Sequence, residues 1–278
     1  QFEPALLEKV VPWREGEPFD QAKLLRLQES LSDLDYFNGI QMTPQTDQAS
    51  DGKVPVKVSL VPAKRSIYGA GVSYGTDSGA GVSGHSERRW MNRRGHKALA
   101  DANLAEKLSD VIVQYKVPGF ALVDGWYTAG ARIHQETIEE VDSELVELSL
   151  TRSGRWRKWI LLAGLYLQRE RYDSIGFGYA EDTAYSTLLY PSLWAQYKNG
   201  DDANYPRRGH GLTFEVRGGS DALGSDVDFM SLRAEGRYVR GLGPDNRLIL
   251  RSELGALLVD DYLSLPPSQR FYAGGDKS

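Results

Sequence analysis

Hydrophobic and polar residues alternate along most of this chain, and this alternation predicts β-strands rather than helices. In the stretch 228–240, for example, Met230 and Leu232 fall on one side, whereas Arg233 and Glu235 fall on the other. Eleven such stretches follow one another from residue 65 onward, and most exceed the roughly five or six residues usual for soluble strands. The predicted strands span 67–76, 79–88, 96–105, 109–117, 121–133, 143–153, 156–169, 187–198, 209–219, 228–240 and 247–260.

The first 62 residues follow a different pattern, with apolar residues at helical spacing. Leu24, Leu27, Leu31 and Leu34 recur every three or four positions, which predicts one buried helix face. Asp20 precedes them and can cap the helix, because its carboxylate can accept hydrogen bonds from free N–H groups of the first turn. The region also predicts a short helix over 2–11 and strands at 40–43 and 54–60, and therefore a small α+β unit.

One face of each long strand carries charged and small residues, and this face decides the environment of the sheet. Unpaired charge in a dry core costs too much free energy to recur at so many positions. Such a face can instead line a water-filled barrel while the apolar face meets lipid. Strand length and the aromatic residues expected at strand ends, Trp156, Trp159 and Tyr166, favour a transmembrane barrel. A soluble sheet with one solvated face would show the same alternation and is the alternative.

Composition agrees with an exported barrel and disfavours other classes. The net charge is −5, so no basic surplus indicates a nucleic-acid-binding surface. Cysteine is absent, which excludes disulfides and thiolate metal sites. The 29 glycines, 15 tyrosines and 6 tryptophans are typical of barrels, and no apolar run approaches the roughly 18 residues of a transmembrane helix.

Two short strings resemble enzyme motifs but lack the surroundings that those motifs need. GVSYG at 71–75 fits the nucleophile elbow of hydrolases, and GAGVSG at 79–84 fits a dinucleotide-binding loop. Both lie in predicted strands with no helix after them. The histidines, at 85, 96, 134 and 210, lack metal-ligand spacing. We therefore expect no enzymatic activity, no cofactor and no metal. Pro191 lacks an N–H and is predicted to mark a bulge or kink.

Several strings along the chain occur in the same order in one known family. The first region contains WREGEPF at 13–19 and LSDLDYFN at 31–38, and the second contains GVSYGTD at 71–77. WMN at 90–92 with GH at 95–96, GSDVDF at 224–229 and LPPSQRFYAGGDKS at 265–278 follow. With these strings the chain resembles the outer-membrane β-barrel assembly proteins, the family of TamA and BamA.

The resemblance implies an all-β transmembrane antiparallel barrel preceded by a small α+β POTRA domain. Residues 1–62 correspond to the POTRA domain, without its first strand, and residues 65–278 to the first part of the barrel. The family's barrel has sixteen strands, with an inward-folding loop after the eleventh. We therefore expect a partial chain that reaches this loop. The residues carried over as loop-positioning residues are Phe271, Tyr272, Gly274, Gly275 and Asp276.

The resemblance also implies a function without covalent chemistry, at a lateral gate beside the first barrel strand. The residues assigned to this gate are Ile67, Gly69, Gly71, Ser73 and Gly75. The expected protein lies in the bacterial outer membrane with its POTRA domain in the periplasm. Its expected partners are membrane lipid, autotransporter-type β-barrel substrates and a TamB-like periplasm-spanning protein. The alternatives are a two-partner secretion pore and, from another class, a soluble all-β binding protein or polysaccharide-active enzyme.

Overall fold

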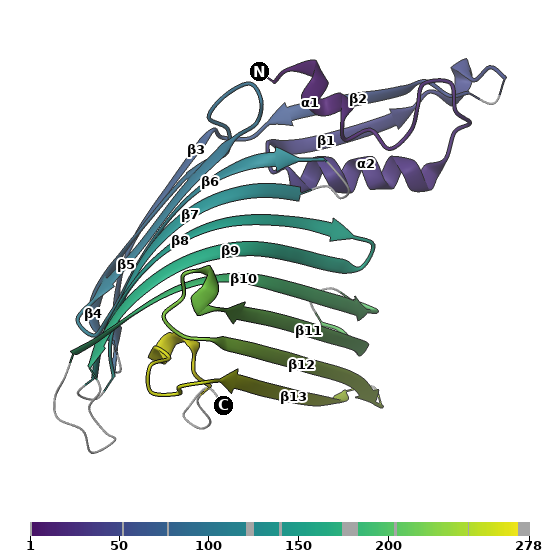
Figure 1. The fold of residues 1–278 in the computed structure, drawn as a ribbon. Helices are drawn as coiled ribbons and strands as arrows, with labels where there is room; N and C mark the ends of the chain where they lie inside the picture. The colour runs from purple at the N-terminus through teal and green to yellow at the C-terminus, as the bar shows by residue number, and fades with distance from the viewer. Residues whose placement is uncertain are drawn as a thin grey trace.

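A small N-terminal α/β unit sits at one end of a large curved sheet in the computed structural model (Figure 1). The structure describes residues 2–51, 53–76, 78–120, 125–138, 141–173, 183–202, 205–243 and 245–271. The N-terminal unit consists of α1 (Pro4–Glu8), α2 (Gln21–Asp33), β1 (Phe37–Pro44), the 3-10 turn η1 (Thr46–Gln48) and β2 (Val56–Pro62).

Helix α2 forms as the leucine spacing predicts and supplies most of the core of the unit. The Asp20 side chain accepts a hydrogen bond from the Ala22 backbone N–H at 2.8 Å, which confirms the predicted cap. Leu27, Leu31 and Leu34 are buried and pack with Leu6, Val10 and Tyr36. The antiparallel pair β1 and β2 completes the unit. The short first helix is only five residues long, because Pro12 and the polar turn after it prevent a longer one.

The second region is one antiparallel meander in which each strand pairs with its sequence neighbours. Its strands are β3 (Ser66–Gly75), β4 (Gly79–Arg88), β5 (Lys97–Ala105), β6 (Leu108–Gly119), β7 (Gly125–Ile138), β8 (Val141–Trp156), β9 (Trp159–Asp173), β10 (Thr183–Gly200), β11 (Arg208–Gly219), β12 (Phe229–Leu242) and β13 (Asn246–Val259). All eleven predicted strands are therefore confirmed. Two 3-10 turns, η2 (Asp221–Leu223) and η3 (Pro267–Gln269), lie on the concave side of the sheet (Figure 1).

The sheet separates an apolar convex face from a polar concave face, as the alternation predicts. Leu150, Leu193 and Leu254 on the convex face are 65%, 60% and 73% exposed. On the concave face, Gln168 and Glu170 are fully buried. A continuous exposed apolar surface of this kind indicates contact with a membrane or another apolar partner. None of the described helices is long and apolar enough to span a membrane.

The bulge predicted at Pro191 and the strand-end position predicted for Tyr166 were wrong. Pro191 causes no bulge in the β9–β10 ladder, since it pairs in register with Leu165. It lies instead where the β10–β11 ladder stops, because that ladder begins at Ser192. Tyr166 is not at a strand end; it lies within β9 on the concave face and stacks on Tyr190, with ring centroids 5.3 Å apart.

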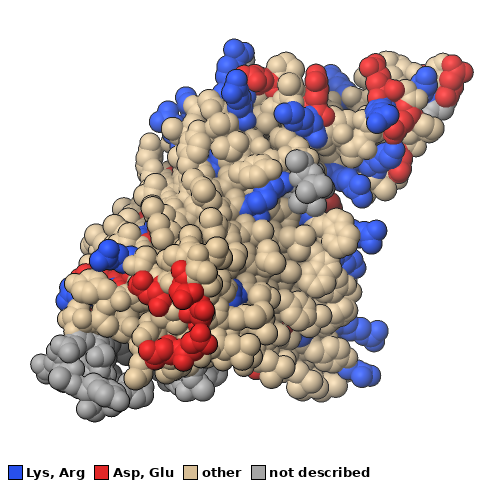
Figure 2. Space-filling model, in the orientation of Figure 1, with Lys and Arg blue, Asp and Glu red and all other residues tan. Residues whose placement is uncertain are grey.

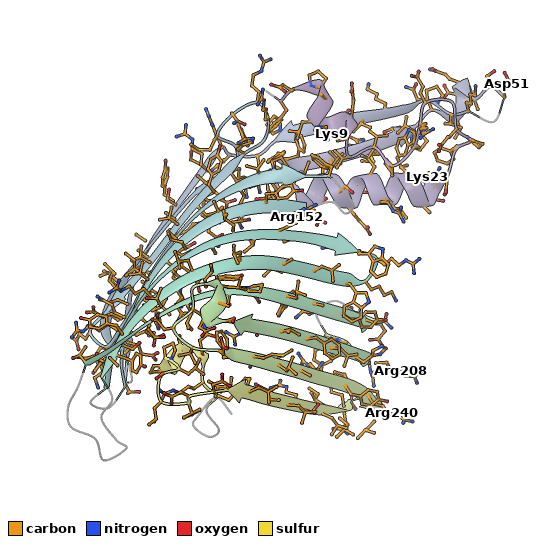
Figure 3. The ribbon with its side chains drawn as sticks, in the orientation of Figure 1. Lys9, Lys23, Asp51, Arg152, Arg208 and Arg240 are labelled. Atoms are coloured by element: carbon orange, nitrogen blue, oxygen red, sulfur yellow. The ribbon has the colours of Figure 1, made fainter. Side chains whose placement is uncertain are left out.

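Charged side chains are unevenly distributed over the molecule (Figure 2). Lys and Arg gather along the edge of the sheet where β9 to β13 have their ends nearest the N-terminal unit. Arg208 and Arg240 lie at this edge (Figure 3). Asp and Glu cluster near the opposite strand ends. The two ends of the strands therefore face surroundings of different charge.

Candidate functional site

Strand β3 forms one edge of the sheet and, among the described residues, is paired only with β4. The residues predicted for the lateral gate share one face of this strand: Ile67, Gly69, Gly71, Ser73 and Gly75. The register across the sheet places this face on the concave side. On the opposite, convex face, Tyr68, Val72 and Tyr74 are 74%, 88% and 82% exposed.

The β3–β4 hairpin has few cross-strand side-chain contacts, because a glycine takes part in many of its pairs. Gly71 lies opposite Ser83, Ala70 opposite Gly84, and Gly75 opposite Gly79. Cross-strand side-chain pairs are the main local stabilisation of a sheet, and glycine in a strand weakens it. Space is also limited on the concave face, since a Cβ added at Gly71 would lie 2.7 Å from Ser83 Oγ. The arrangement leaves a thin, weakly supported strand with one exposed backbone edge.

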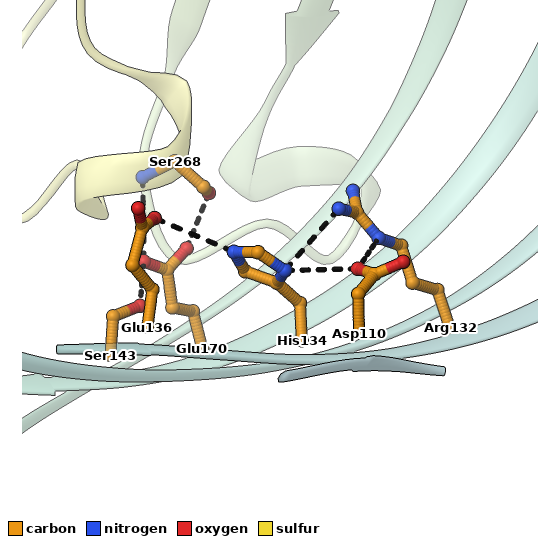
Figure 4. A network of polar contacts seen from close by, with 7 residues as sticks. All are labelled: Asp110, Arg132, His134, Glu136, Ser143, Glu170 and Ser268. Carbon is orange, nitrogen blue, oxygen red and sulfur yellow. Dashed lines mark hydrogen bonds and ion pairs between the residues drawn. The ribbon is translucent and has the colours of Figure 1, made fainter. Parts of the chain in front are cut away.

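Polar side chains form a network on the concave face, away from that edge (Figure 4). Arg132 of β7 donates through Nε to Asp110 of β6 at 2.6 Å. The His134 Nδ1 atom lies 2.9 Å from the same carboxylate oxygen, and its Nε2 atom lies 3.5 Å from Glu136. The charges of this network are thus paired, which lowers the cost of holding them on the concave face.

The segment that follows β13 folds back and docks onto this concave face. Glu170 of β9 accepts hydrogen bonds from the Ser268 backbone N–H at 3.3 Å, from the Ser268 hydroxyl and from Ser143 at 2.9 Å. Gln269 donates to the Gln168 side-chain oxygen at 2.7 Å. These contacts join residues about a hundred positions apart in the sequence, so η3 links the end of the described chain to the middle of the sheet.

Apolar packing supports the same docking. Leu265 is fully buried and packs with Leu188, Tyr190, Val227 and Phe229. Arg217 of β11 donates to the Gln269 side chain at 3.1 Å, so the docked segment spans β9 to β11. One fully buried leucine and several buried hydrogen bonds hold the segment in one position.

Part of the predicted inward loop lies in this segment. Phe271 is half-buried, and its ring is packed against Gly255 of β13, where an added Cβ would lie 3.2 Å from it. The other predicted loop residues lie outside the described residues: Tyr272, Gly274, Gly275 and Asp276. The contacts made by Leu265, Ser268 and Gln269 were not predicted. Two features of the sequence could have indicated these contacts: the string LPPSQRFYAGGDKS at 265–278, and the polar face of β9.

The N-terminal unit is joined to the sheet by a buried lysine. Lys97, the first residue of β5, has its Nζ atom 5.4 Å and 5.1 Å from the ring centroids of Tyr36 and Trp126. The same atom lies 3.7 Å from Asp35, whose carboxylate also accepts from Arg89 at 3.0 Å. The Tyr36 hydroxyl donates to the Gly95 carbonyl. Burial raises the pKa of Tyr36 above its ordinary value, which is itself well above neutral, so the hydroxyl is a hydrogen-bond donor.

Within the described part of the chain, no three His, Cys, Asp or Glu side chains are grouped so that they could hold a metal ion. The enzyme-like strings at 71–75 and 79–84 lie inside β3 and β4, and a hairpin rather than a helix connects these strands. Neither string has the strand–turn–helix setting that its motif requires.

Comparison with known families covers both regions of the chain. The model described as "Omp85 superfamily domain" matches residues 99–278, and the POTRA model described as "Surface antigen variable number repeat" matches residues 1–63. A curated relative, "Outer membrane protein assembly factor BamA" from Nitratidesulfovibrio vulgaris (strain Hildenborough), is 24% identical over 279 residues. That match covers 94% of this chain and 34% of the relative, so the chain spans about a third of the relative's length.

Two solved structures share the fold. BamA from Haemophilus ducreyi lacking POTRA domains 1-3 superposes with a TM-score of 0.75 at 14% identity, covering 100% of this chain and 57% of that chain. CdiB from Acinetobacter baumannii superposes with a TM-score of 0.57, also at 14% identity, covering 100% of this chain and 54% of that chain. At this identity the likeness concerns the fold alone.

Proposed function

The chain belongs to the Omp85 superfamily of bacterial outer-membrane proteins, and from this membership we propose that it acts as a TamA-like insertase. In this proposal residues 1–62 form the periplasmic POTRA domain, and residues 65–278 form barrel strands that lead to an inward loop. The substrates are autotransporter-type β-proteins, and the periplasmic partner is a TamB-like protein. The protein carries out no covalent chemistry.

The observation that carries the proposal is the glycine-rich β3–β4 hairpin, which forms one of the two edges of the sheet in the described residues. In hydrocarbon, each unpaired backbone N–H or C=O costs several kcal/mol, so a strand edge there attracts a pairing partner strongly. An incoming substrate strand can add to β3 by β-augmentation and satisfy these groups. The proposed gate residues are the concave-face set Ile67, Gly69, Gly71, Ser73 and Gly75, which keep this strand thin and weakly held.

In this proposal the docked segment supports the strands of the sheet that do not open. Leu265, Ser268 and Gln269 attach it to β9, β10 and β11 on the concave side. A wall braced in this way keeps its curvature while the seam at β3 opens. The predicted loop residues Phe271, Tyr272, Gly274, Gly275 and Asp276 extend this brace in the proposal.

Reconstitution tests the proposal. The full-length protein is inserted into liposomes and supplied with a urea-unfolded autotransporter β-domain, a generic outer-membrane porin or a secreted exoprotein. We expect faster assembly of the autotransporter β-domain than in protein-free liposomes, measured by its heat-modifiable migration on gels. Transport of the exoprotein into the vesicles, without any assembly of β-domains, would contradict the proposal and support a two-partner secretion pore instead.

A further inference from the structure

Two arginines face each other directly at the lipid-facing edge of the sheet. Arg208 begins β11 and is in register with Arg240 near the end of β12. Both side chains are exposed, and both lie at the strand ends nearest the N-terminal unit (Figure 3). Like charges directly opposite each other destabilise a sheet. Among the described residues neither guanidinium forms an ion pair, so this repulsion has no protein partner to offset it.

One carboxylate of the loop that precedes Arg208 is engaged by the backbone. Asp201, in the loop between β10 and β11, accepts hydrogen bonds from the backbone N–H groups of Arg207 and Arg208 at 2.9 Å and 3.0 Å. These bonds lower the pKa of Asp201 and orient its carboxylate toward the backbone. Asp201 therefore fixes the backbone at Arg208 and forms no ion pair with the guanidinium group of Arg208 or Arg240.

An aromatic layer lies next to the arginine pair on the convex face. His210 and Tyr238 form the next cross-strand pair on that face. His210 stacks on Tyr197 at 5.5 Å, and Tyr197 contacts Trp159 at 5.3 Å. Farther along the strands the face becomes aliphatic, with Leu254, opposite Ala234, 73% exposed. Aromatic residues of this kind mark the boundary between headgroups and hydrocarbon.

The order of guanidinium, aromatic and aliphatic groups matches the order of phosphate, glycerol and acyl chain in a phospholipid. Guanidinium groups bind phosphate oxygens through paired N–H donors, and a shared phosphate would turn the repulsion of the pair into attraction. The POTRA unit is periplasmic, so this edge meets the periplasmic leaflet. We propose that Arg208 and Arg240 together bind the phosphate of an anionic phospholipid in that leaflet. This site is independent of the assembly activity.

The test compares lipid binding by full-length variants in detergent micelles. Native mass spectrometry measures the apparent dissociation constants of phosphatidylglycerol and phosphatidylcholine. We expect the wild-type protein to prefer phosphatidylglycerol, and Arg208→Gln with Arg240→Gln to reduce this preference by about 5-fold per arginine. The lysine variants Arg208→Lys and Arg240→Lys should retain part of the preference, because they keep the charge but lose the paired donors.

The matched control is a second pair of opposed arginines, which lies on the concave face of the sheet. Arg237 and Arg251 are directly opposite each other on β12 and β13, on the concave side. Arg237→Gln with Arg251→Gln removes the same charge and should leave the preference unchanged, with heat-modifiable migration confirming that every variant is folded. An unchanged preference in the Arg208 and Arg240 variant, or an equal loss in the control, would overturn the proposal. So would displacement of the lipid by millimolar inorganic phosphate, which would indicate a free-anion site.

Discussion

A few residues attach the N-terminal unit to the sheet, and one of them, Gly95, has no room for a larger side chain. Gly95 has φ of +76°, and an added Cβ would lie 2.8 Å from Tyr36 Cζ and 2.9 Å from Leu6 Cδ2. Its carbonyl accepts the Tyr36 hydroxyl, and Lys97 is buried against the Tyr36 ring. A change at Gly95 therefore reaches the core of the unit and the junction together.

We expect Gly95→Ala to destabilise this junction more than Gly243→Ala does. Gly243 has a similar φ of +79° but no atom within 4 Å of an added Cβ. Both variants carry a backbone cost of about 1–3 kcal/mol, and only Gly95→Ala adds a steric clash. Thermal unfolding followed by the fluorescence of Trp90 and Trp126, which line the junction, measures the difference. Equal midpoints for the two variants would show that the junction tolerates the extra methyl group.

Predictions about the positions and contacts of single residues were less reliable than predictions about strands. The Asp20 cap could be predicted, because capping depends on neighbours along the chain. Pro191 and Tyr166 could not be placed, because their positions depend on where a neighbouring ladder stops and on which face of β9 is concave. The burial of Lys97 between Tyr36 and Trp126 depends on the docking of two units and leaves no trace in local sequence.

Among the elements, the segment from β13 to Phe271 has the role that was hardest to predict. Strand positions follow from alternation, since each strand must present one apolar face. The segment has no such period, and its contacts with Gln168 and Glu170 depend on tertiary structure. The family resemblance indicated an inward loop but did not indicate that Leu265, Ser268 and Gln269 anchor it.

Leu265→Ala should release the docked segment, because it leaves a cavity beside Leu188 and Phe229. Burial of this kind is worth about 2–5 kcal/mol. Hydrogen exchange of residues 260–271 should become faster, while exchange in β9 stays slow. The matched control is Leu263→Ala, two residues away, where the side chain is 48% exposed. If both variants exchanged like the wild type, Leu265 would not anchor the segment.

A substitution that adds a side chain to the β3–β4 hairpin should stabilise it and slow the opening of the proposed gate. Gly84 lies opposite Ala70 and has no atom within 4 Å of an added Cβ. Gly84→Val adds a cross-strand contact and should stabilise the hairpin by about 0.2–1 kcal/mol. Amide exchange in β3 should slow, and substrate assembly in liposomes should slow with it. Faster exchange in β3 would mean that the valine disturbs the strand instead of supporting it.

The whole molecule is a curved wall with a braced centre and a weakly supported edge. The number and order of its strands could be predicted from the sequence, because alternation and turns are local properties. The curvature of the wall and the path of the chain back across its concave face could not, since they arise from contacts between distant strands. The proposed function depends on the contrast between the braced strands β9 to β11 and the edge strand β3.

Site-specific cross-linking during assembly tests this contrast most directly. A photoreactive amino acid replaces Val72 on β3 or Leu150 on β8, which are 88% and 65% exposed on the same convex face. We expect an assembling β-domain to cross-link strongly at position 72 and only weakly at position 150, because β3 has a free backbone edge whereas β8 is paired on both sides. Equal cross-linking at the two positions, or assembly that proceeds with none at position 72, would contradict it.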